Sequence, residues 1–572
     1  MKVKDSIILK KNNKIVKEIF WNNSPIKEEY QICLADYIEE NSKDLRKKIL
    51  FLLEDIEFQN KEIIKEIEIK KEFSFWNLTN FNEKSLYKKN YFFNLAKIIS
   101  LIEILENYSY EDLHINIKDK YFDDFLNKII KKKKIETKLS IAINLNYFQN
   151  IFYEVLSFFR SLKFLIAKIF YSKEKNEVNI NYNLFFSFFT YLDKKKFIEK
   201  NYKSIFWGKI SAYTKINFVH LFIPNEILNN YNNLNKKINE LNKPNELHSL
   251  LDSHISLKTI YEIFKISFIL KMRHFLNRNR YKLYYKNYNL SDLLIFDLRE
   301  NFYLFNITKR LYYFFLFESF FKKNKFHSNC FYIHENQPWE KSLIYHWKKN
   351  QNKKIYGVIN ASIRFWDLKY AKNAVNPDFL LTNGKDSYSK AVEYGYNKHE
   401  VINVESLRYK KKLTLKNHNS SQDLLIVFDY LKISNDYLIS VLNNTKILSN
   451  YNIYFKEHPL NKLNNIKFNF QYKFIDNQYK KNNFNLIICT NRTTAQVDYL
   501  RSGFNLAILL EPNSFNLSPL KGNQECDFFK SSSDLTKILN KRIDNNTNII
   551  KNEFFLTDES YKEWNKILNE KK

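Results

Sequence analysis

From about residue 420 onward, short apolar runs alternate with amphipathic segments. Four apolar runs predict buried strands, at 423–429, 452–459, 484–490 and 505–512. Helical patterns follow three of them, at 435–444, 493–503 and 531–543. Strands that alternate with helices are typical of a doubly wound parallel sheet, whose ligands bind beyond the carboxyl ends of the strands. We therefore predict a Rossmann-like domain over 411–545.

Residues 330–405 alternate in the same way. The runs CFYIH, KIYGVI, DFLLT and VINVE predict strands, and PWEKSLIYHWKKN predicts a helix between the first two. The first 330 residues mix aromatic-rich helical segments with few turn signals, and a chain of 572 residues is too long for one core. We predict an α/β protein with three parts: an N-terminal domain over 1–410 with helical insertions at about 120–320, the domain over 411–545, and a C-terminal helix within 546–572.

One N-terminal segment, 155–172, has two distinct faces at helical spacing. Polar side chains share one face: Ser157, Arg160, Ser161, Lys168 and Ser172. Apolar side chains share the other: Val155, Phe158, Phe159, Leu162, Leu165, Ile166, Ile169 and Phe170. Two interpretations stay open. The helix packs its apolar face on the core, or it lies on a membrane surface with its basic residues toward the lipid head groups.

The formal charge of the chain is +30 at pH 7, and it comes mostly from lysines scattered along the sequence. A general bias toward Lys, Asn, Ile, Phe and Tyr explains such a charge, so we predict no nucleic-acid partner; a basic surface also suits anionic lipid or phosphorylated substrates. The four cysteines lack paired or metal-ligand spacing, and we predict no metal site. The N-terminal apolar segment is too short for a signal peptide, and no run of about 18 residues lacks charge. We therefore expect a cytoplasmic protein.

A polar cluster, TNRTT, follows the predicted strand 484–490, where a helix should begin. Thr490, Asn491, Thr493 and Thr494 bring hydroxyl and amide groups to this point, and Arg492 adds a positive charge. Free backbone N–H groups and the helix dipole make a helix N-terminus a suitable anion site. A plain helix cap without a ligand explains the same residues, so both interpretations stay open.

A second cluster lies one strand–helix unit earlier, in EHP. Pro459 cannot continue the strand ladder, so His458 is held at the carboxyl edge of the predicted sheet. An imidazole there can bind a phosphate, or the sugar and base of a nucleotide. A lone histidine at a strand end is more often structural, but here it should face the same crevice as TNRTT. Together the two clusters predict a nucleotide-phosphate site, although the sequence contains neither GxGxxG nor a P-loop motif.

A third cluster follows the strand CFYIH. His334, Glu335 and Asn336 lie at its carboxyl end, and Pro338 begins the next helix. Glu335 is the best candidate for a general base, because a carboxylate at a strand end can meet an acceptor hydroxyl in a cleft. A plain structural role at the helix start remains open for it. Glu340 is the reserve candidate, and its helical position equally suits a cap or a salt bridge.

The motifs EHP, TNRTTAQVDYLRSG and GYNKHEVINVESLRY resemble a GT-B glycosyltransferase. More narrowly, four segments resemble a family of bacterial surface-carbohydrate (O-antigen) biosynthesis proteins: FSFWNLTNFNEKS (73–85), ENQPWEKSLIYHW (335–347), YGVINASIRFWDLKY (356–370) and NLSPL (516–520). The HP and Ser/Thr motifs are similar to those of bacterial sialyltransferases and Kdo transferases. The resemblance covers about 70–110 and 330–530. One feature departs from it, because those enzymes often have an acidic-acidic-glycine base motif and this chain has His-Glu-Asn.

The resemblance implies two Rossmann-like domains that face a cleft. A nucleotide-activated, cytidine-linked sugar would be transferred to a hydroxyl of a glycan or lipid-linked glycan by direct displacement. No acidic pair with metal-binding spacing adjoins the motifs, so we predict a reaction without a metal or other cofactor. Glu335 would be the base and His458 would assist the departing phosphate. The resemblance implies that His458 and Thr493 or Thr494 contact the nucleotide phosphate. We add the neighbouring residues of the motifs as candidates: Pro459, Thr490, Asn491, Arg492 and Ser518 on the donor side, and His334, Asn336, Glu340, Arg364 and Arg408 on the acceptor side or in the cleft, where the two arginines could hold a carboxylate or phosphate. For the two arginines, structural ion pairing is an equal alternative.

Two other functions fit the same motifs. One is an alditol-phosphate transferase with a CDP-linked donor. The other is a non-catalytic basic scaffold that binds polysaccharide or nucleic acid, which predicts no tight nucleotide binding and no dependence on His458. For the enzyme we expect a cytoplasmic location, with contact to the inner membrane face through 155–172.

Overall fold

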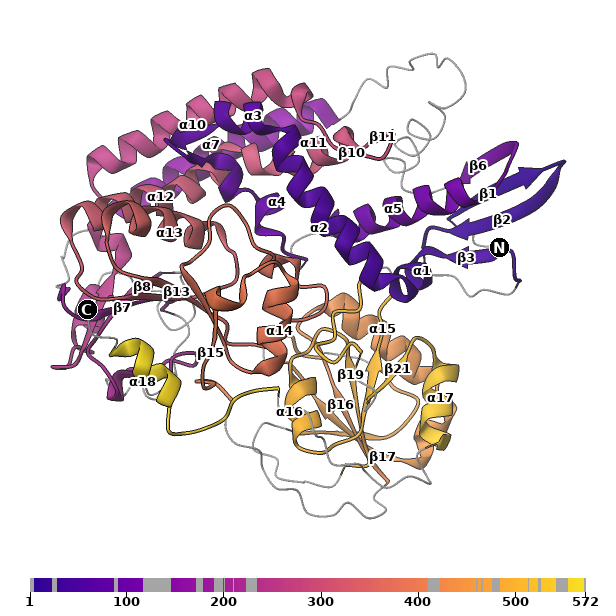
Figure 1. Ribbon diagram of the computed structural model, residues 1–572. Helices are drawn as coiled ribbons and strands as arrows, with labels where there is room; N and C mark the ends of the chain where they lie inside the picture. The colour runs from indigo at the N-terminus through magenta and orange to yellow at the C-terminus, as the bar shows by residue number, and fades with distance from the viewer. Residues whose placement is uncertain are drawn as a thin grey trace.

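The structure is a computed structural model, and Figure 1 shows its arrangement. It describes residues 5–22, 28–86, 91–116, 146–170, 178–189, 199, 201–208, 210–222, 234–409, 422–458, 461–463, 467–475, 484–512, 514–522, 526–541 and 554–569. Within these residues two parallel sheets form the centres of two domains, and a smaller N-terminal sheet lies beside them.

The N-terminal domain is built on a seven-stranded parallel sheet of order β15-β14-β13-β12-β7-β8-β9. Its strands are β7 (Asn183–Phe188), β8 (Ile216–Leu221), β9 (Glu246–Leu250), β12 (Cys330–Ile333), β13 (Ile355–Val358), β14 (Phe379–Thr382) and β15 (Val401–Asn403). The chain builds outward from β7 in one direction and then returns to add β12 on the other side. This reversal of strand order is the topological switch point at which doubly wound sheets bind ligands.

Helices cover both faces of this sheet because alternate strand residues point to opposite faces. Phe186 and Tyr332 pack in the large core under the helical layer at the top of Figure 1, whereas Phe185 and Phe331 pack on the other face with Trp564. The helical layer contains α7 (Asn146–Phe170), α10 (Leu257–Asn277), α11 (Ser291–Arg299), α12 (Leu304–Lys323) and α13 (Pro338–Asn350). Smaller elements of this domain are α9 (Leu234–Asn239), α14 (Lys385–Glu393), β10 (Tyr284–Tyr285) and β11 (Tyr288–Asn289).

The C-terminal domain has a six-stranded parallel sheet of order β18-β17-β16-β19-β20-β21. Its strands are β16 (Asp423–Val427), β17 (Asn452–Lys456), β18 (Tyr472–Phe474), β19 (Leu486–Thr490), β20 (Leu506–Leu509) and β21 (Cys526–Phe529). Numbered within the domain, this is the order 3-2-1-4-5-6 of a dinucleotide-binding sheet, with its switch point between β16 and β19. The helices are α15 (Lys432–Asn443), α16 (Ala495–Arg501) and α17 (Ser532–Lys541).

The chain then returns to the N-terminal domain, where α18 (Lys562–Leu568) packs on the seven-stranded sheet (Figure 1). The return path is tight at Gly384, since a Cβ there would lie 2.0 Å from the carbonyl oxygen of Phe554. Glu405 accepts hydrogen bonds from the first N–H groups of α18, at Glu563 and Trp564 (3.0 and 3.2 Å). The C-terminal helix therefore belongs structurally to the first domain.

The N-terminal residues form a separate four-stranded sheet of order β3-β2-β1-β6. Its strands are β1 (Ser6–Lys11), β2 (Lys14–Phe20), β3 (Gln31–Cys33) and β6 (Asp112–Asn116). The nearby elements are α1 (Leu34–Glu40), α2 (Ser42–Gln59), α3 (Lys61–Glu66), β4 (Glu68–Lys70), β5 (Phe73–Ser74), α4 (Asn80–Glu83) and α5 (Tyr91–Asn107). Helix α1 contacts the C-terminal domain through ion pairs of Asp36 with Lys530 and Glu39 with Lys521. This small unit thus bridges the two domains.

The predicted fold class, two Rossmann-like α/β domains with helical additions, is confirmed. The alternation predicted from residue 420 onward matches the strands and helices observed, and Gly503 has a positive φ of 78° directly after α16. The range 120–320 holds more than helical insertions, because it also supplies β7, β8 and β9 of the central sheet. Within the described ranges, no helix has both the length and the apolar character required to cross a membrane.

Candidate active site

The switch point of the C-terminal sheet is closed by a buried hydrogen bond between two strand ends. Thr490 Oγ1, at the end of β19, donates to Asp429 Oδ2, just beyond β16, at 2.9 Å. Asp429 is itself fixed, because Asn435 in α15 accepts its N–H (2.7 Å) and donates to its carbonyl (2.9 Å). Both Thr490 and Asp429 are buried. Thr490 therefore sets the geometry of the crevice and does not line it.

A buried glutamine, Gln496, holds the turn between β19 and α16. Its Nε2 donates to the carbonyl of Thr490 (2.6 Å), and its Oε1 accepts from Ser518 Oγ (2.6 Å). Ser518 is fully buried, and its hydroxyl also accepts from the N–H of Leu520 (3.0 Å). Ser518 therefore stabilises the turn through Gln496 and, being buried, does not line the crevice. The sequence motifs did not single out Gln496, although a lone polar side chain between Ala495 and Val497 on a short helix was a usable signal.

The side chains of the 491–494 turn divide into buried and partly exposed groups. Asn491 is buried; its Nδ2 donates to the carbonyl of Phe515 (3.3 Å), while its Oδ1 has no hydrogen-bond partner among the described residues. Thr493 and Thr494 are half-buried, and Thr493 Oγ1 accepts from the N–H of Ala495 (3.3 Å). Thr494 occupies the N-cap of α16, but its side chain makes no capping hydrogen bond. Thr494 and Thr493 are thus the hydroxyls placed nearest to solvent at this strand end.

Two arginines meet where the domains face each other. Arg364, in the loop after β13 of the N-terminal domain, donates from its guanidinium to the carbonyl of Arg492 (2.7 Å) in the C-terminal domain. Arg492 Nε lies 3.2 Å from Glu511 Oε2, and burial raises the pKa of Glu511, opposed by the charge of Arg492. Next to this contact, Trp366 stacks on Phe515 with ring centroids 4.1 Å apart. The carboxyl edges of the two parallel sheets therefore touch at this joint.

His458 lies at the carboxyl end of β17, as predicted. It is half-buried, and its ring centroid is 5.9 Å from that of Tyr430, which follows β16. Burial and Asp429 raise the pKa of Tyr430, whereas Arg492 and Arg364 lower it, so both guanidinium groups act on this tyrosine. Tyr430, 41% exposed, is a crevice residue that the sequence did not reveal.

The loop after β17 is held by the first residue of the EHP motif. Glu457 accepts from the N–H of Leu463 (2.6 Å) and from Lys462 Nζ (3.2 Å). Pro459 lies outside the described residues. Arg408 is exposed near the linker between the domains, where its guanidinium lies over the rings of Phe206 and Tyr409 (5.6 and 5.3 Å).

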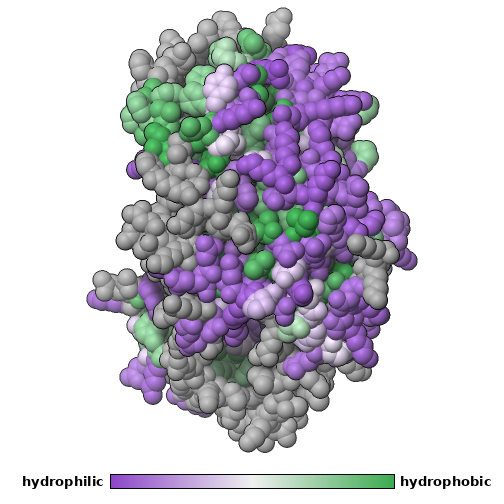
Figure 2. All heavy atoms as spheres, turned by 90° about the vertical axis from the view of Figure 1, so that its left-hand side faces the viewer, coloured by the Kyte–Doolittle hydropathy of each residue, from purple (hydrophilic) through white to green (hydrophobic). Residues whose placement is uncertain are grey.

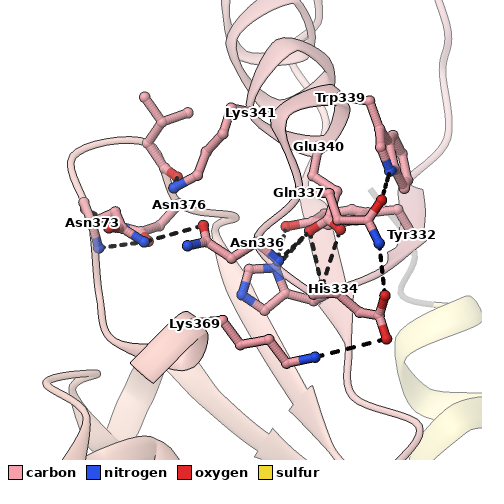
Figure 3. Close-up of polar contacts among 12 residues, drawn as sticks. Tyr332, His334, Asn336, Gln337, Trp339, Glu340, Lys341, Lys369, Asn373 and Asn376 are labelled. Atoms are coloured by element: carbon pink, nitrogen blue, oxygen red, sulfur yellow. Dashed lines mark hydrogen bonds and ion pairs between the residues drawn. The ribbon is translucent and has the colours of Figure 1, made fainter. Parts of the chain in front are cut away.

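The N-terminal domain contributes the turn 334–340, drawn in Figure 3. Glu340, fully buried near the start of α13, accepts hydrogen bonds from the N–H groups of Glu335 (3.0 Å) and Asn336 (2.9 Å). Burial raises the pKa of Glu340 far above its usual range, the charge of Glu335 adds to the rise, and the backbone N–H groups oppose it. Glu340 therefore caps the backbone N–H groups of the turn. Of the roles that its sequence position left open, the contacts of Glu340 match the cap.

Glu335 is the exposed carboxylate of this turn. Its side chain is 42% exposed, accepts a hydrogen bond from Gln337 Nε2 (2.8 Å) and lies 3.8 Å from Lys369 Nζ. Gln337 is fixed in turn, because its Oε1 accepts from Trp339 Nε1 (2.9 Å; Figure 3). A cation and an amide thus hold the carboxylate in place at the carboxyl end of β12 and leave part of it open to solvent. Gln337 and Lys369 were not predicted.

His334, by contrast, is buried and supports the turn from below. Its Nδ1 lies 3.0 Å from the hydroxyl of Tyr332 and 3.3 Å from Glu340 Oε2. Burial lowers the pKa of His334 to about 3, and the charges of Lys341 and Lys369 add to this effect. The imidazole is therefore neutral near pH 7. Gly357 on the adjacent strand makes room for it, since a Cβ there would lie 3.2 Å from the Cβ of His334.

Asn336 ties the turn to the N-terminal segment 73–85. It has a positive φ of 60°, and its Nδ2 donates to the carbonyls of Asn82 (3.0 Å) and Glu83 (3.1 Å). Asn373 Nδ2 donates to its Oδ1 (3.2 Å; Figure 3). Lys341, also buried, donates to the carbonyl of Val375 (3.3 Å), and burial lowers its pKa to about 7. Segments 73–85 and 335–347 therefore form one structural unit, with Asn336 inside it and out of the cleft.

The described residues contain no group of three or more His, Cys, Asp or Glu side chains that could hold a metal ion. Glu340 and His334 contact each other instead, with Oε2 and Nδ1 3.3 Å apart. Of the strand-end residues described above, Glu335, Tyr430, His458, Arg492, Thr493 and Thr494 are not buried.

The similarity of this chain to known proteins lies in its three-dimensional structure. No family model matches the chain, and no curated protein matches it. Three solved structures illustrate the similarity. They are the lipopolysaccharide outer core galactosyltransferase WaaB in its apo form (9% identical; 63% of this chain and 89% of that chain; TM-score 0.33), UDP-N-acetylglucosamine 2-epimerase from Rickettsia bellii (10%; 66% and 92%; 0.34) and TarM (10%; 68% and 96%; 0.33). At these values the similarity supports no inference about activity, and the fold assignment above rests on strand order.

Proposed function

We propose that this protein is a GT-B-type glycosyltransferase that moves a sugar from a nucleotide-activated donor to a hydroxyl of an acceptor. The observation that carries the proposal is the contact between Arg364 and the Arg492 carbonyl, which brings the carboxyl edges of two doubly wound sheets together. Ligands of such sheets bind at the carboxyl edge beside the switch point. Two such edges that face each other suit two substrates held in one cleft.

The C-terminal domain is the donor side in this proposal. Thr493 and Thr494 offer hydroxyl donors to a phosphate, and Arg364 and Arg492 supply positive charge nearby. His458 approaches from the end of β17 and would donate to a phosphate oxygen as the nucleotide departs. Groups already fixed by protein contacts stabilise charge without having to reorganise during the reaction.

On the acceptor side, Glu335 is the proposed general base. Its carboxylate would take the proton of the acceptor hydroxyl while that oxygen forms a bond to the anomeric carbon. The bond from the anomeric carbon to the phosphate oxygen breaks in the same step, and the nucleotide leaves with the electron pair. Gln337 and Lys369 keep the carboxylate oriented.

The finer parts of the proposal are a cytidine-linked donor and a surface-polysaccharide or O-antigen glycan, free or lipid-linked, as the acceptor. They are supported by the resemblance of the motifs. The joining of segments 73–85 and 335–347 through Asn336 agrees with their acting as one unit beside the acceptor. The proposed location is the cytoplasmic side of the membrane.

Thermal unfolding with CMP, CDP, UDP and GDP tests the donor site. One nucleotide should raise the unfolding temperature of the wild-type protein, because a ligand that binds only the native state stabilises it. The increase should disappear in His458→Ala and Thr493→Ala. His399→Ala, at an exposed histidine away from the joint, is the matched control and should retain it. No increase with any nucleotide at about millimolar concentration, or an equal increase in all variants, would contradict the proposal.

A further inference from the structure

Helix α7 is amphipathic, but its orientation is the reverse of what a soluble helix requires. Ser157, Ser161 and Lys168, on its polar face, are 5%, 0% and 7% exposed. Four apolar side chains lie on the opposite face at positions that share one stripe. They are Phe152 (66% exposed), Val155 (52%), Phe159 (61%) and Ile166 (53%). Val155, Phe159 and Ile166 therefore do not pack on the core, whereas Leu165 of the same predicted face does. Lys168 does not reach toward head groups as the membrane-surface interpretation required, and the side chains of Ile169, Phe170 and Ser172 lie outside the described residues.

Specific partners hold the polar face inward. Lys168 pairs with Asp252, whose side chain is 1% exposed, and the Tyr312 hydroxyl donates to the same carboxylate (2.6 Å). Nearby, the hydroxyl of Ser157 accepts from the N–H of Phe305 (2.6 Å), and Phe164 packs edge-on against Tyr312. These contacts fix the rotation of the helix. The exposed apolar stripe is thus a consequence of a defined buried network.

Helix α10 has a second stripe of the same kind. On its inner side, Thr259, Ile263 and Ser267 are buried. Its exposed positions are apolar: Leu257 (73%), Tyr261 (63%), Phe268 (43%), Met272 (56%) and Phe275 (59%). The two helices are joined by an ion pair of Glu154 with Lys271 and by the rings of Phe158 and Phe264, 6.2 Å apart. The two stripes therefore belong to one surface, which we call the α7/α10 face.

Basic side chains accompany the apolar ones on the α7/α10 face. Arg160, Lys163, Lys258 and Lys265 are exposed, and the acids of the two helices are few, namely Glu154 and Glu262. Figure 2 shows hydrophobic side chains gathered at the upper end of the molecule, next to hydrophilic ones. Single exposed apolar residues are ordinary on protein surfaces, but a contiguous patch of this kind marks an interaction site. Its positive charge favours a partner that is both apolar and anionic.

We propose that the α7/α10 face binds the surface of an anionic lipid bilayer. Its aromatic and aliphatic side chains enter the boundary between head groups and acyl chains, and its lysines and arginines contact lipid phosphates. The buried polar network keeps this face apolar before the membrane is reached. The inference stands apart from the proposed glycosyl transfer, because membrane binding needs neither substrate.

Co-sedimentation of the full-length protein with vesicles tests the proposal. Binding is expected to phosphatidylcholine vesicles that contain about one third phosphatidylglycerol at about 0.1 M salt, and it should weaken with phosphatidylcholine alone or at high salt. The double variant Phe159→Ser/Phe275→Ser should lower the partition coefficient about tenfold or more. Phe474→Ser, at a 51% exposed side chain on β18 of the other domain, is the matched control and should bind as wild type.

A second pair of variants separates the charge from the apolar contribution. Lys163→Glu/Lys265→Glu should lower binding to anionic vesicles about tenfold, while Lys541→Glu in α17 should leave it nearly unchanged. All these sites are exposed, so circular dichroism and thermal unfolding should match wild type. Absence of vesicle binding overturns the proposal. Equal vesicle binding by Phe159→Ser/Phe275→Ser and by its control Phe474→Ser also overturns it. A third contrary outcome is a protein that does not bind vesicles but forms a dimer that Phe159→Ser/Phe275→Ser abolishes, because a second copy of the chain then covers the face.

Discussion

Replacement of Glu335 by glutamine tests the proposed base directly. The amide keeps an oxygen that can accept from Gln337, so the substitution removes the charge attraction to Lys369 at 3.8 Å and the charge that acts on Glu340. That pair joins a 42% exposed carboxylate to a 14% exposed lysine side chain. Pairs that are accessible to water contribute at most about 1 kcal/mol, so the free energy of unfolding should change by less than about 1 kcal/mol.

The rate should fall far more than the stability. Positioned general bases contribute about 10²- to 10⁴-fold, which corresponds to about 3–5 kcal/mol in the activation free energy. Release of nucleotide from the donor that the thermal experiment identifies, measured at saturating acceptor, is the appropriate assay. The limb of the pH–rate profile that reports an ionised base should be present in the wild type and absent from Glu335→Gln.

Glu340→Ala distinguishes the two carboxylates of the turn. Its removal leaves the N–H groups of Glu335 and Asn336 buried without their acceptor, which should cost about 2–5 kcal/mol of stability. The same limb of the pH–rate profile should persist in any activity that remains. The assignment is refuted if Glu335→Gln retains more than about a tenth of the wild-type rate, or if the limb disappears with Glu340 and not with Glu335.

Three other variants or conditions should change stability in ways that the contacts specify. Arg364→Ala should weaken nucleotide binding and lower the free energy of unfolding by about 1.5–3 kcal/mol, because the carbonyl of Arg492 in the opposite domain loses its charged donor. Thermal unfolding with and without nucleotide measures both effects. Burial lowers the pKa values of His274, His334 and His346 to about 3, so as the pH falls the unfolded chain binds protons that the native protein does not. These three groups together should lower the free energy of unfolding by about 4 kcal/mol between pH 7.5 and 5.5 in urea titrations, and His346→Gln should remove about one third of that fall. Lys168→Met should cost about 3–5 kcal/mol by leaving Asp252 buried without its cation, and Lys168→Met/Asp252→Asn should recover part of it.

Local pattern was sufficient for most of the C-terminal domain. Its strands are short apolar runs bounded by polar residues, and its helices have clear periodicity, so the predicted ranges around β16, β17, β19 and β20 agree with the structure. The edge strands β18 and β21 were missed because neither is a continuous apolar run: two of the three residues of β18 are exposed, and β21 has Asp527 at its second position. In the first half, β7 and β8 are buried at every position and lack the alternation of a half-exposed strand, so their sequences do not distinguish a strand from a buried helix.

The order of residues was enough to show that polar groups gather at three strand ends, since a strand followed by a helix fixes where its last residue lies. It was not enough to show which of them face the cleft. Glu335 and Glu340 have the same chemistry, and only the left-handed Asn336 and the return of α13 turn one carboxylate inward and leave the other in reach of solvent.

Helix α7 shows the same limit on a larger scale. Its sequence defines two faces, but periodicity contains no information about which face is buried. Asp252 and Tyr312, 84 and 144 positions beyond Lys168 in the chain, make the polar face the inner one. This orientation depends on the folded chain as a whole, because a buried charge is tolerated only where a partner from elsewhere in the chain meets it.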